Sequence, residues 1–438
     1  MAAKRESALE AYFGLKAQDT SLRIEVVAGF TTFLTMAYIV FVNPLILGDA
    51  GMDKGAVFVA TCLASAIGTL VMGLYANYPL ALAPGMGLNA YFTYGVVKGL
   101  HYSWEVALGA VFISGILFLI LSVTNVREWI VNAIPKSQKM AISAGIGLFL
   151  GIIALKNAGI IAPSPDTLVT LGSLKAPPTL LAIFGFLVLV ALDGRKVPGA
   201  IIIAILVTTL AGIALHVSPF LGVASMPPSL ASTFFKLDLA GTFNAGLLMI
   251  VFAFFFVDFF DNTGTLVGVA HRAGLIGRNG KIPRLMRVFI ADSTATIAGS
   301  LLGTSTVTSY IESAAGVRAG GRTGLVGVVV AALFLLTLFL APLAETVPAY
   351  ATAPALLYVA CIMTRGLAEI DWNDVTEYAP AVVTAIIMPL TFSIANGIAF
   401  GFILYAATKL LTGRKDEASP AVIGLGVLFL VRFIFLAS

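Results

Sequence analysis

Apolar residues in this chain are gathered into long runs that short polar segments separate. A helix needs about 20 predominantly apolar residues to cross the hydrocarbon core of a bilayer. Runs of about that length lie at 24–47, 55–75, 104–124, 139–156, 178–193, 198–216, 244–270, 285–302, 323–342, 350–367, 378–393 and 396–412. The pattern therefore predicts an integral membrane protein that crosses the bilayer many times.

The segment 79–98 is predicted to be an interrupted span rather than a simple helix. Pro84 removes a backbone donor, and Gly85 and Gly87 let another backbone or a ligand approach closely. We therefore expect extended chain up to Pro84 and a half-helix over 86–98. Non-helical backbone persists at membrane depth only where protein buries it or where it lines a polar cavity.

The segment 303–320 has the same character in the second half of the chain. β-Branched residues alternate from Thr304 to Thr308, which predicts a short strand. Thr308 or Ser309 is expected to cap a half-helix that begins near Tyr310. Two such strands at mid-membrane are expected to pair antiparallel, so that both half-helices point their positive dipole ends at a shared cavity.

Composition and charge support this picture and predict an orientation. The 438 residues are 59% hydrophobic and 11% charged, whereas soluble domains carry roughly 25% charged residues. With a cytoplasmic N-terminus, most of the 26 Lys and Arg residues fall on inner segments, as the positive-inside rule requires. Omitting either interrupted span would spoil this bias, so we predict fourteen spans. The basic residues are scattered, which disfavours nucleic acid as a partner.

The two ends of the chain are expected to lie beside this bundle. Segment 1–23 is charged and lacks a continuous apolar core, which predicts an amphipathic lead-in at the cytoplasmic surface. The apolar run 420–437 predicts a C-terminal helix that either crosses the membrane or lies on it.

The two halves of the chain resemble each other. The pair of spans that begins at Pro178 matches the pair that begins at Pro380 in its polar or glycine turn and its final glycine. In each half, the interrupted span is the third predicted span. Because seven spans per half is an odd number, the halves have opposite orientations, as in transporters built from inverted repeats. A general richness in glycine and alanine would produce the same likeness without a repeat.

Four polar side chains within predicted spans are candidates for a functional site, because such residues are rare in membranes. Asp258 and Asp261 lie three residues apart and so share a helix face. Glu312 is expected two residues into the second half-helix, and Asn89 lies in the first. As alternatives, Glu312 would cap its half-helix, and either aspartate would bond the interrupted backbone.

These acids and this amide suit a flat, neutral ligand that is rich in N–H donors. Carboxylates accept hydrogen bonds from ring N–H and amine groups, and aromatic faces stack on a ring. The neighbouring aromatic residues are Tyr91, Phe92, Phe254, Phe255, Phe259 and Phe260. Three acids disfavour an anion, and phenylalanine neighbours disfavour a metal ion. The three histidines have no metal-ligand spacing, which disfavours a membrane enzyme.

Five motifs closely resemble those of the adenine/guanine/hypoxanthine permeases, the AzgA-like branch of the nucleobase–cation symporters. They are GFTTFLTMAYIVFVNPLIL (29–47), ALAPGMGLNAYF (81–92), FVDFFDNTGTLVG (256–268), GTSTVTSYIESAAGVRAGGRTG (303–324) and ATAPALLYV (351–359). The resemblance covers nearly the whole chain. It implies an all-α polytopic membrane protein with fourteen segments in two inverted repeats. These repeats would be 24–216, with core 24–124 and gate 139–216, and 244–412, with core 244–342 and gate 350–412.

The resemblance also implies a function and a site. The expected activity is proton symport of a purine base (adenine, hypoxanthine or guanine) into the cell across the plasma or inner membrane, by a homodimer without a cofactor. Asp258 and Glu312 would contact the base and couple the proton, with Asp261 and Asn89 in support. The expected substrate-binding set is completed by Phe259, Thr308, Ser309 and Gly87. Ser313 follows Glu312 where xanthine, urate and uracil carriers have Asn, which disfavours those substrates.

Anion transporters of the sulfate and bicarbonate type share this architecture and form the main alternative. A channel is a weaker alternative, because it would not need a closed, acid-lined site at mid-membrane.

Overall fold

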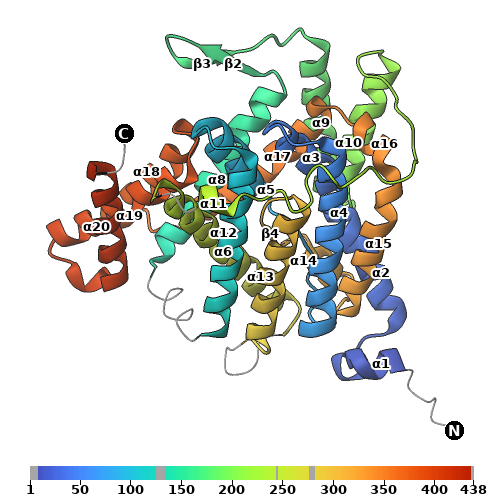
Figure 1. Cartoon of the computed structure of the whole chain (residues 1–438), viewed down its shortest axis with the longest axis horizontal. Coiled ribbons are helices and arrows are strands. Elements are labelled where there is room, and N and C mark those ends of the chain that lie inside the picture. The colour runs from blue at the N-terminus through green and yellow to red at the C-terminus, as the bar shows by residue number, and fades with distance from the viewer. Residues whose placement is uncertain (1–7, 125–133, 243–244, 276–281, 436–438) are drawn as a thin grey trace.

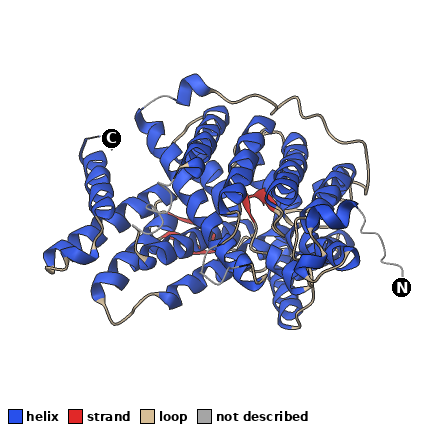
Figure 2. Ribbon diagram, turned by 90° about the horizontal axis from the view of Figure 1, so that it is seen from below, coloured by secondary structure: helices blue, strands red, loops and turns tan. Residues whose placement is uncertain are grey.

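Helices make up most of the molecule, and short strands lie among them (Figures 1 and 2). The computed structural model describes residues 8–124, 134–242, 245–275 and 282–435. Within these residues, nine helices are long and apolar enough to cross a membrane. They are Leu22–Gly48 (α2 Leu22–Met36 with α3 Ile39–Gly48), Lys54–Ala76 (α4 Lys54–Val71 and its extension), α6 Trp104–Val123, α8 Lys136–Asn157, α9 Pro177–Gly194, α13 Leu285–Leu302, Leu325–Thr346 (α15 Leu325–Thr337 to α16 Ala341–Thr346), Ala349–Glu369 (α17 Ala349–Thr364 and its extension) and α19 Ile394–Leu411.

Four further helices complete the bundle. They are α10 Ala200–Ala214, the long α12 Ala245–Arg272, α18 Val375–Leu390 and α20 Pro420–Phe435. The predicted helical membrane architecture is therefore confirmed, while the number of crossings stays a prediction.

The two interrupted spans meet through their strands, as the sequence predicted. Strand β1, Leu82–Pro84, pairs antiparallel with β4, Val307–Ser309, and Ala83 lies opposite Thr308. Figure 2 shows strands enclosed by helices near the middle of the molecule. The first half-helix, α5 Met86–Ala90, continues as a wider π-helical stretch to Gly99.

The second half-helix begins later than predicted. Helix α14 is Ser313–Arg318, so Glu312 precedes the helix instead of lying two residues inside it. Tyr310 explains the delay, because its N–H donates to Ala81 O (2.9 Å) and thereby extends the strand pairing. Thr308 and Ser309 consequently lie in β4 and do not cap α14; the prediction of a cap there was wrong.

Neighbouring side chains satisfy the backbone groups of the strands. The Thr69 hydroxyl of α4 satisfies both backbone groups of Leu82: it accepts from Leu82 N (2.9 Å) and donates to Leu82 O (3.1 Å). Ser313 Oγ accepts from Ala81 N (3.0 Å), and Gly85 N donates to the Thr306 carbonyl (2.9 Å). These bonds let extended backbone persist where water is absent.

The helices pack as two groups. In one, α8 contacts α17, α18 and α19, and α9 contacts α10 and α17. In the other, α13 contacts α4 and α6, α15 contacts α2 and α4, and α12 contacts α6. The predicted division into a core and a gate concerns movement, so it stays a prediction.

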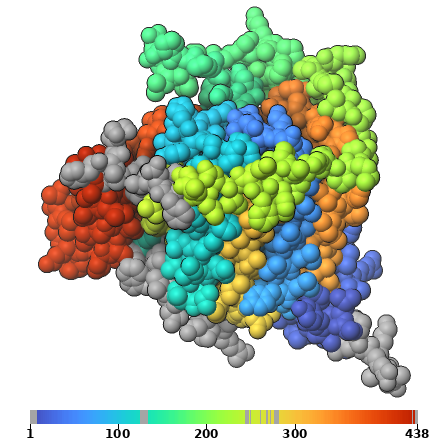
Figure 3. Space-filling view, viewed as in Figure 1, coloured from blue at the N-terminus to red at the C-terminus, as the bar shows by residue number. Residues whose placement is uncertain are grey.

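Connections outside the bundle run over its surface. Residues 215–238, between α10 and α11 (Leu239–Thr242), cross the face formed by α4 and α6 (Figure 3). Asp238 N donates to Glu105 O (2.9 Å) and Phe235 N to Leu301 O (2.8 Å), which fastens the end of this segment to α6 and α13. A hairpin of β2, Ile161–Ser164, and β3, Leu168–Leu171, which the sequence analysis did not predict, projects beyond α8 (Figure 1).

The ends of the chain are described only in part. Residues 1–7 of the lead-in and 436–437 of the last apolar run lie outside the described residues. Helix α1, Ala8–Phe13, brings Phe13 against Leu325 of α15. Helix α20 packs on α19, where Phe429 lies 6.2 Å from Phe402 between ring centroids.

Replacing Thr69 by valine is expected to destabilise the protein, because the change leaves both backbone groups of Leu82 unpaired in a buried site. The expected loss is about 1–3 kcal/mol of unfolding free energy. Thr294→Val is the matched control, since the Thr294 hydroxyl bonds Ile290 O within its own helix (2.6 Å). Equilibrium unfolding in detergent measures both, and equal losses would contradict this account of Thr69.

Candidate functional site

Acidic side chains converge where α12 and α13 meet the interrupted spans. Asp258 of α12 is 1% exposed, and Thr296 of α13 donates to its Oδ2 (3.4 Å). The same hydroxyl bonds the Val307 carbonyl of β4 (2.8 Å), which ties the acid to the strand. Asp258 Oδ1 has no hydrogen-bond donor among the described residues.

A second buried acid, Asp292, escaped the sequence analysis. It lies on α13 and is fully buried, and Ser309 of β4 donates to its Oδ1 (3.2 Å). Its Oδ2, like Asp258 Oδ1, has no donor within the described part of the chain. The signal was available, because an acid inside the apolar run 285–302 is as unusual as Asp258.

Asp261 and Glu312 are more accessible than this buried pair. The Asp261 side chain is exposed, and Glu312 is half-buried just before α14. Their charges lie close enough to interact. Tyr38, at the break between α2 and α3, donates to Glu312 Oε1 (2.7 Å). The site therefore has two acids that are at least partly accessible, Asp261 and Glu312, and two that are buried, Asp258 and Asp292.

No ion pair joins these four acids to a basic side chain in the ranges that the structure describes. An ionised carboxylate that is buried without a counter-charge is costly. Such a cluster therefore favours partners that bring N–H donors, a proton or a positive charge.

Other predicted site residues have mainly structural contacts. Asn89 accepts a short hydrogen bond from Ser305, which joins the two interrupted spans. Gly87 lies against Ile146 of α8, where a side chain would clash. Thr308 is buried in β4, opposite Ala83.

Phe259 belongs to an aromatic cluster. Its ring packs edge-on against Phe118 (centroids 5.8 Å apart) and stacks on Phe255 (5.7 Å), within an aromatic cluster between α6 and α12. The Phe260 side chain lies outside the described part of the structure. The role of Phe259 in stacking on a ligand stays a prediction.

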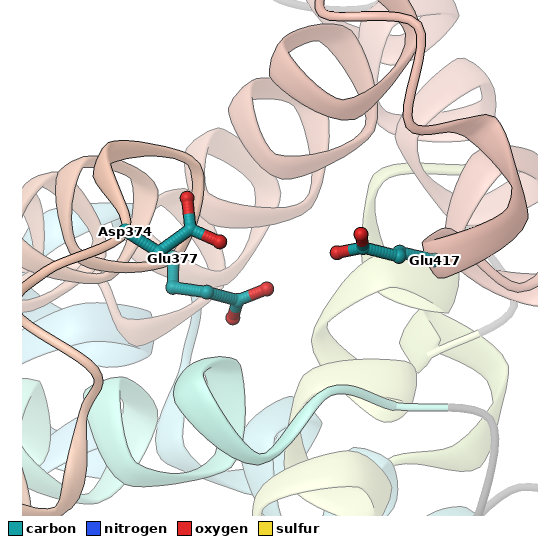
Figure 4. Close-up of side chains that lie close together, drawn as sticks. All are labelled: Asp374, Glu377 and Glu417. Carbon is teal, nitrogen blue, oxygen red and sulfur yellow. The ribbon is translucent and has the colours of Figure 1, made fainter.

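A separate acidic group, Asp374, Glu377 and Glu417, brings three carboxylates within 4.8 Å of one another (Figure 4). Two cations of the chain largely offset its negative charge. Lys409 Nζ, fully buried, lies 2.7 Å from both Glu377 and Glu417, and Arg414 lies 2.7 Å from Asp374. Because the ammonium group already lies among the carboxylates, this group ties α18 and α19 to the segment that precedes α20 and is not a candidate metal centre.

Helices of a membrane bundle around two paired, interrupted spans form the architecture of a membrane transport protein. A model of the permease family matches residues 23–400, and the chain belongs to that family. The adenine permease AdeP of Escherichia coli is 50% identical over 98% of this chain and 96% of its own length. The guanine/hypoxanthine permease PbuG of Bacillus subtilis is 46% identical over 98% and 100%. The resemblance seen in the motifs is confirmed.

Solved structures confirm the fold. The transmembrane domain of the cyanobacterial bicarbonate transporter BicA matches with a TM-score of 0.65 and 17% identity, over 88% of this chain and 97% of that one. At this identity the likeness shows the inverted-repeat fold alone.

The ionic group around Lys409 predicts a pH dependence of stability. The Thr376 hydroxyl, followed by Arg414, lowers the pKa of Asp374 from its ordinary 3.8 to about 2. Because the folded state favours the charged form, the contribution of Asp374 is complete above about pH 4 and disappears as the pH falls through about 2. We expect Asp374→Asn to lower the unfolding midpoint equally from pH 8 to 5, and to lose this effect towards pH 2.

Thermal unfolding in detergent across this pH series is the measurement. Asp166→Asn, in the exposed turn between β2 and β3, is the control and should change little at any pH. An effect of Asp374→Asn that grew on acidification would contradict the expected sign.

Proposed function

We propose that this permease imports purine nucleobases, namely adenine, hypoxanthine or guanine, by proton symport. The observation that carries the proposal is the cluster of Asp258, Asp261, Asp292 and Glu312, which lies at paired interrupted spans without a basic partner among the described residues. The relatives named as adenine and guanine/hypoxanthine permeases support the substrate class.

Recognition of the base would depend on hydrogen-bond polarity. Ionised carboxylates only accept, and a purine offers ring N–H groups, with an exocyclic amine in adenine and guanine. Glu312 and Asp261 are accessible enough to meet such an edge, and Asp258 has one oxygen without a donor in the described structure. Charge-assisted bonds of this kind are roughly twice as strong as neutral ones.

Proton coupling would follow from the cost of moving a buried charge. A proton taken up by Asp258 or Glu312 removes a negative charge that no basic side chain of the described structure offsets. The neutral, loaded site would then move with the core past the gate, whereas the empty, charged site would resist that movement. Asp292 would share the proton with Asp258, because both approach the same strand from neighbouring helices.

We also propose a membrane, an oligomeric state and an orientation for the protein. The protein would lie in the plasma or inner membrane as a homodimer, with its N-terminus in the cytoplasm. The charge asymmetry of the sequence supports this orientation.

Anion transport is the second candidate, because BicA shares the fold. Four acids without a basic partner among the described residues argue against it, since an anion would meet repulsion at each of them. The fold likeness alone does not favour an anion.

Competition for uptake separates the two candidates. In proteoliposomes that contain the purified protein, uptake of radiolabelled adenine, hypoxanthine or guanine should be inhibited by the other purines. A large excess of sulfate or bicarbonate should have no effect. Inhibition by the anions with no response to purines would overturn the proposal.

Substitution of the acids tests whether they take part in proton-coupled uptake. Asp258→Asn and Glu312→Gln are each expected to reduce proton-driven purine accumulation by at least about tenfold, because each removes a charged acceptor. Glu345→Gln, at an exposed position near the end of α16, is the control and should accumulate purine normally. Uptake with and without a proton gradient, and proton co-flux reported by a pH-sensitive dye, are the measurements. Full, gradient-dependent accumulation by Glu312→Gln would remove Glu312 from coupling.

A further inference from the structure

Tyr38 contacts the accessible acid of the site from a different part of the chain. It lies at the turn between α2 and α3 and is 1% exposed, so protein surrounds its hydroxyl. That hydroxyl donates to Glu312 Oε1 (2.7 Å). One turn earlier, the Thr35 hydroxyl donates to the Thr32 carbonyl of its own helix (2.8 Å) and lies 3.4 Å from the Glu312 backbone carbonyl. The first span therefore contacts both the side chain and the backbone of one residue in the second interrupted span.

Glu312 has little else to orient its carboxylate. It occupies the position before α14, but its side chain makes no capping hydrogen bond to that helix. Among the described residues, Tyr38 is the one side chain that donates to it. The hydroxyl of Ser313, the first residue of α14, accepts a hydrogen bond from the Ala81 backbone N–H (3.0 Å). Without Tyr38 the glutamate side chain would keep its rotamer freedom, which is a cost that binding must overcome.

We propose that Tyr38 is a positioning residue for the transported base: it holds Oε1 of Glu312 and thereby leaves Oε2 as the oxygen that meets the ligand or the proton. This inference rests on the proposed function, since it names how one acid of that site is oriented. A phenol donates one hydrogen, and Oε1 can accept it both from a carboxylate and from a carboxylic acid whose proton is on Oε2. The bond to Tyr38 thus persists through both protonation states.

The chain offers a matched control. Tyr94 donates to Asp49 Oδ2 over the same distance, 2.7 Å, and its ring is also buried, but this pair lies away from the acid cluster. Tyr94→Phe and Tyr38→Phe therefore remove the same kind of bond from different places.

The first measurement is the dissociation constant of the purified protein for adenine, hypoxanthine and guanine. We expect Tyr38→Phe to weaken binding of the transported purine by about tenfold, the effect of one bond to a charged group, and Tyr94→Phe to leave it unchanged. The transport rate at saturating purine should change much less than the affinity. An unchanged dissociation constant for Tyr38→Phe, or an equal loss in Tyr94→Phe, would overturn the inference.

The second measurement needs no ligand. A double-mutant cycle combines Tyr38→Phe with Glu312→Ala and follows equilibrium unfolding in detergent. Because alanine has no oxygen to accept the Tyr38 bond, Tyr38→Phe should destabilise the Glu312→Ala protein less than the parent. Additive effects would show that the two side chains do not interact and would refute the positioning role. If the parent protein binds no purine, the proposed function fails, and this cycle alone then decides about Tyr38.

Discussion

The structure depends on one constraint: backbone groups at membrane depth must find hydrogen-bond partners inside the protein. The two interrupted spans meet this constraint together. Strands β1 and β4 pair with each other, and the remaining groups of Leu82 and Ala81 are satisfied by hydroxyls of Thr69 and Ser313. Neither interrupted span could satisfy its backbone alone, so the two halves of the chain have to assemble around this contact.

The same strand contact also organises the acids. The Thr296 hydroxyl bonds the Val307 carbonyl (2.8 Å) and lies 3.4 Å from Asp258 Oδ2, and Ser309 of β4 donates to Asp292. The two hydroxyls that contact the buried carboxylates are therefore linked to β4: Thr296 bonds its backbone, and Ser309 is part of it.

The sequence was sufficient to predict the features that depend on residue type and on neighbours along the chain. Proline, glycine and alternating threonine predicted the interrupted spans and their pairing, and the apolar context singled out Asp258 and Glu312. The start of α14 was misplaced because the bond from Tyr310 to Ala81, more than 200 residues away, extends β4. Whether Phe259 faces the acids or an aromatic cluster likewise depends on packing against Phe118, and sequence spacing does not contain that information.

Two acidic groups of the protein differ in how their negative charge is compensated. Around Lys409, three carboxylates meet two cations, and the charges are largely compensated where they lie. Lys409 is fully buried, so removing its carboxylate partners would leave a buried cation unpaired, and the group is useful as a fixed link. Asp258 and Asp292 have hydroxyl donors but no cation within the described residues, so their negative charge is only partly offset. Two buried carboxylates without a cation lower stability, so a purely structural role does not account for them. An incompletely compensated charge is, however, what a carrier needs if the ligand and the proton are to supply the missing partner.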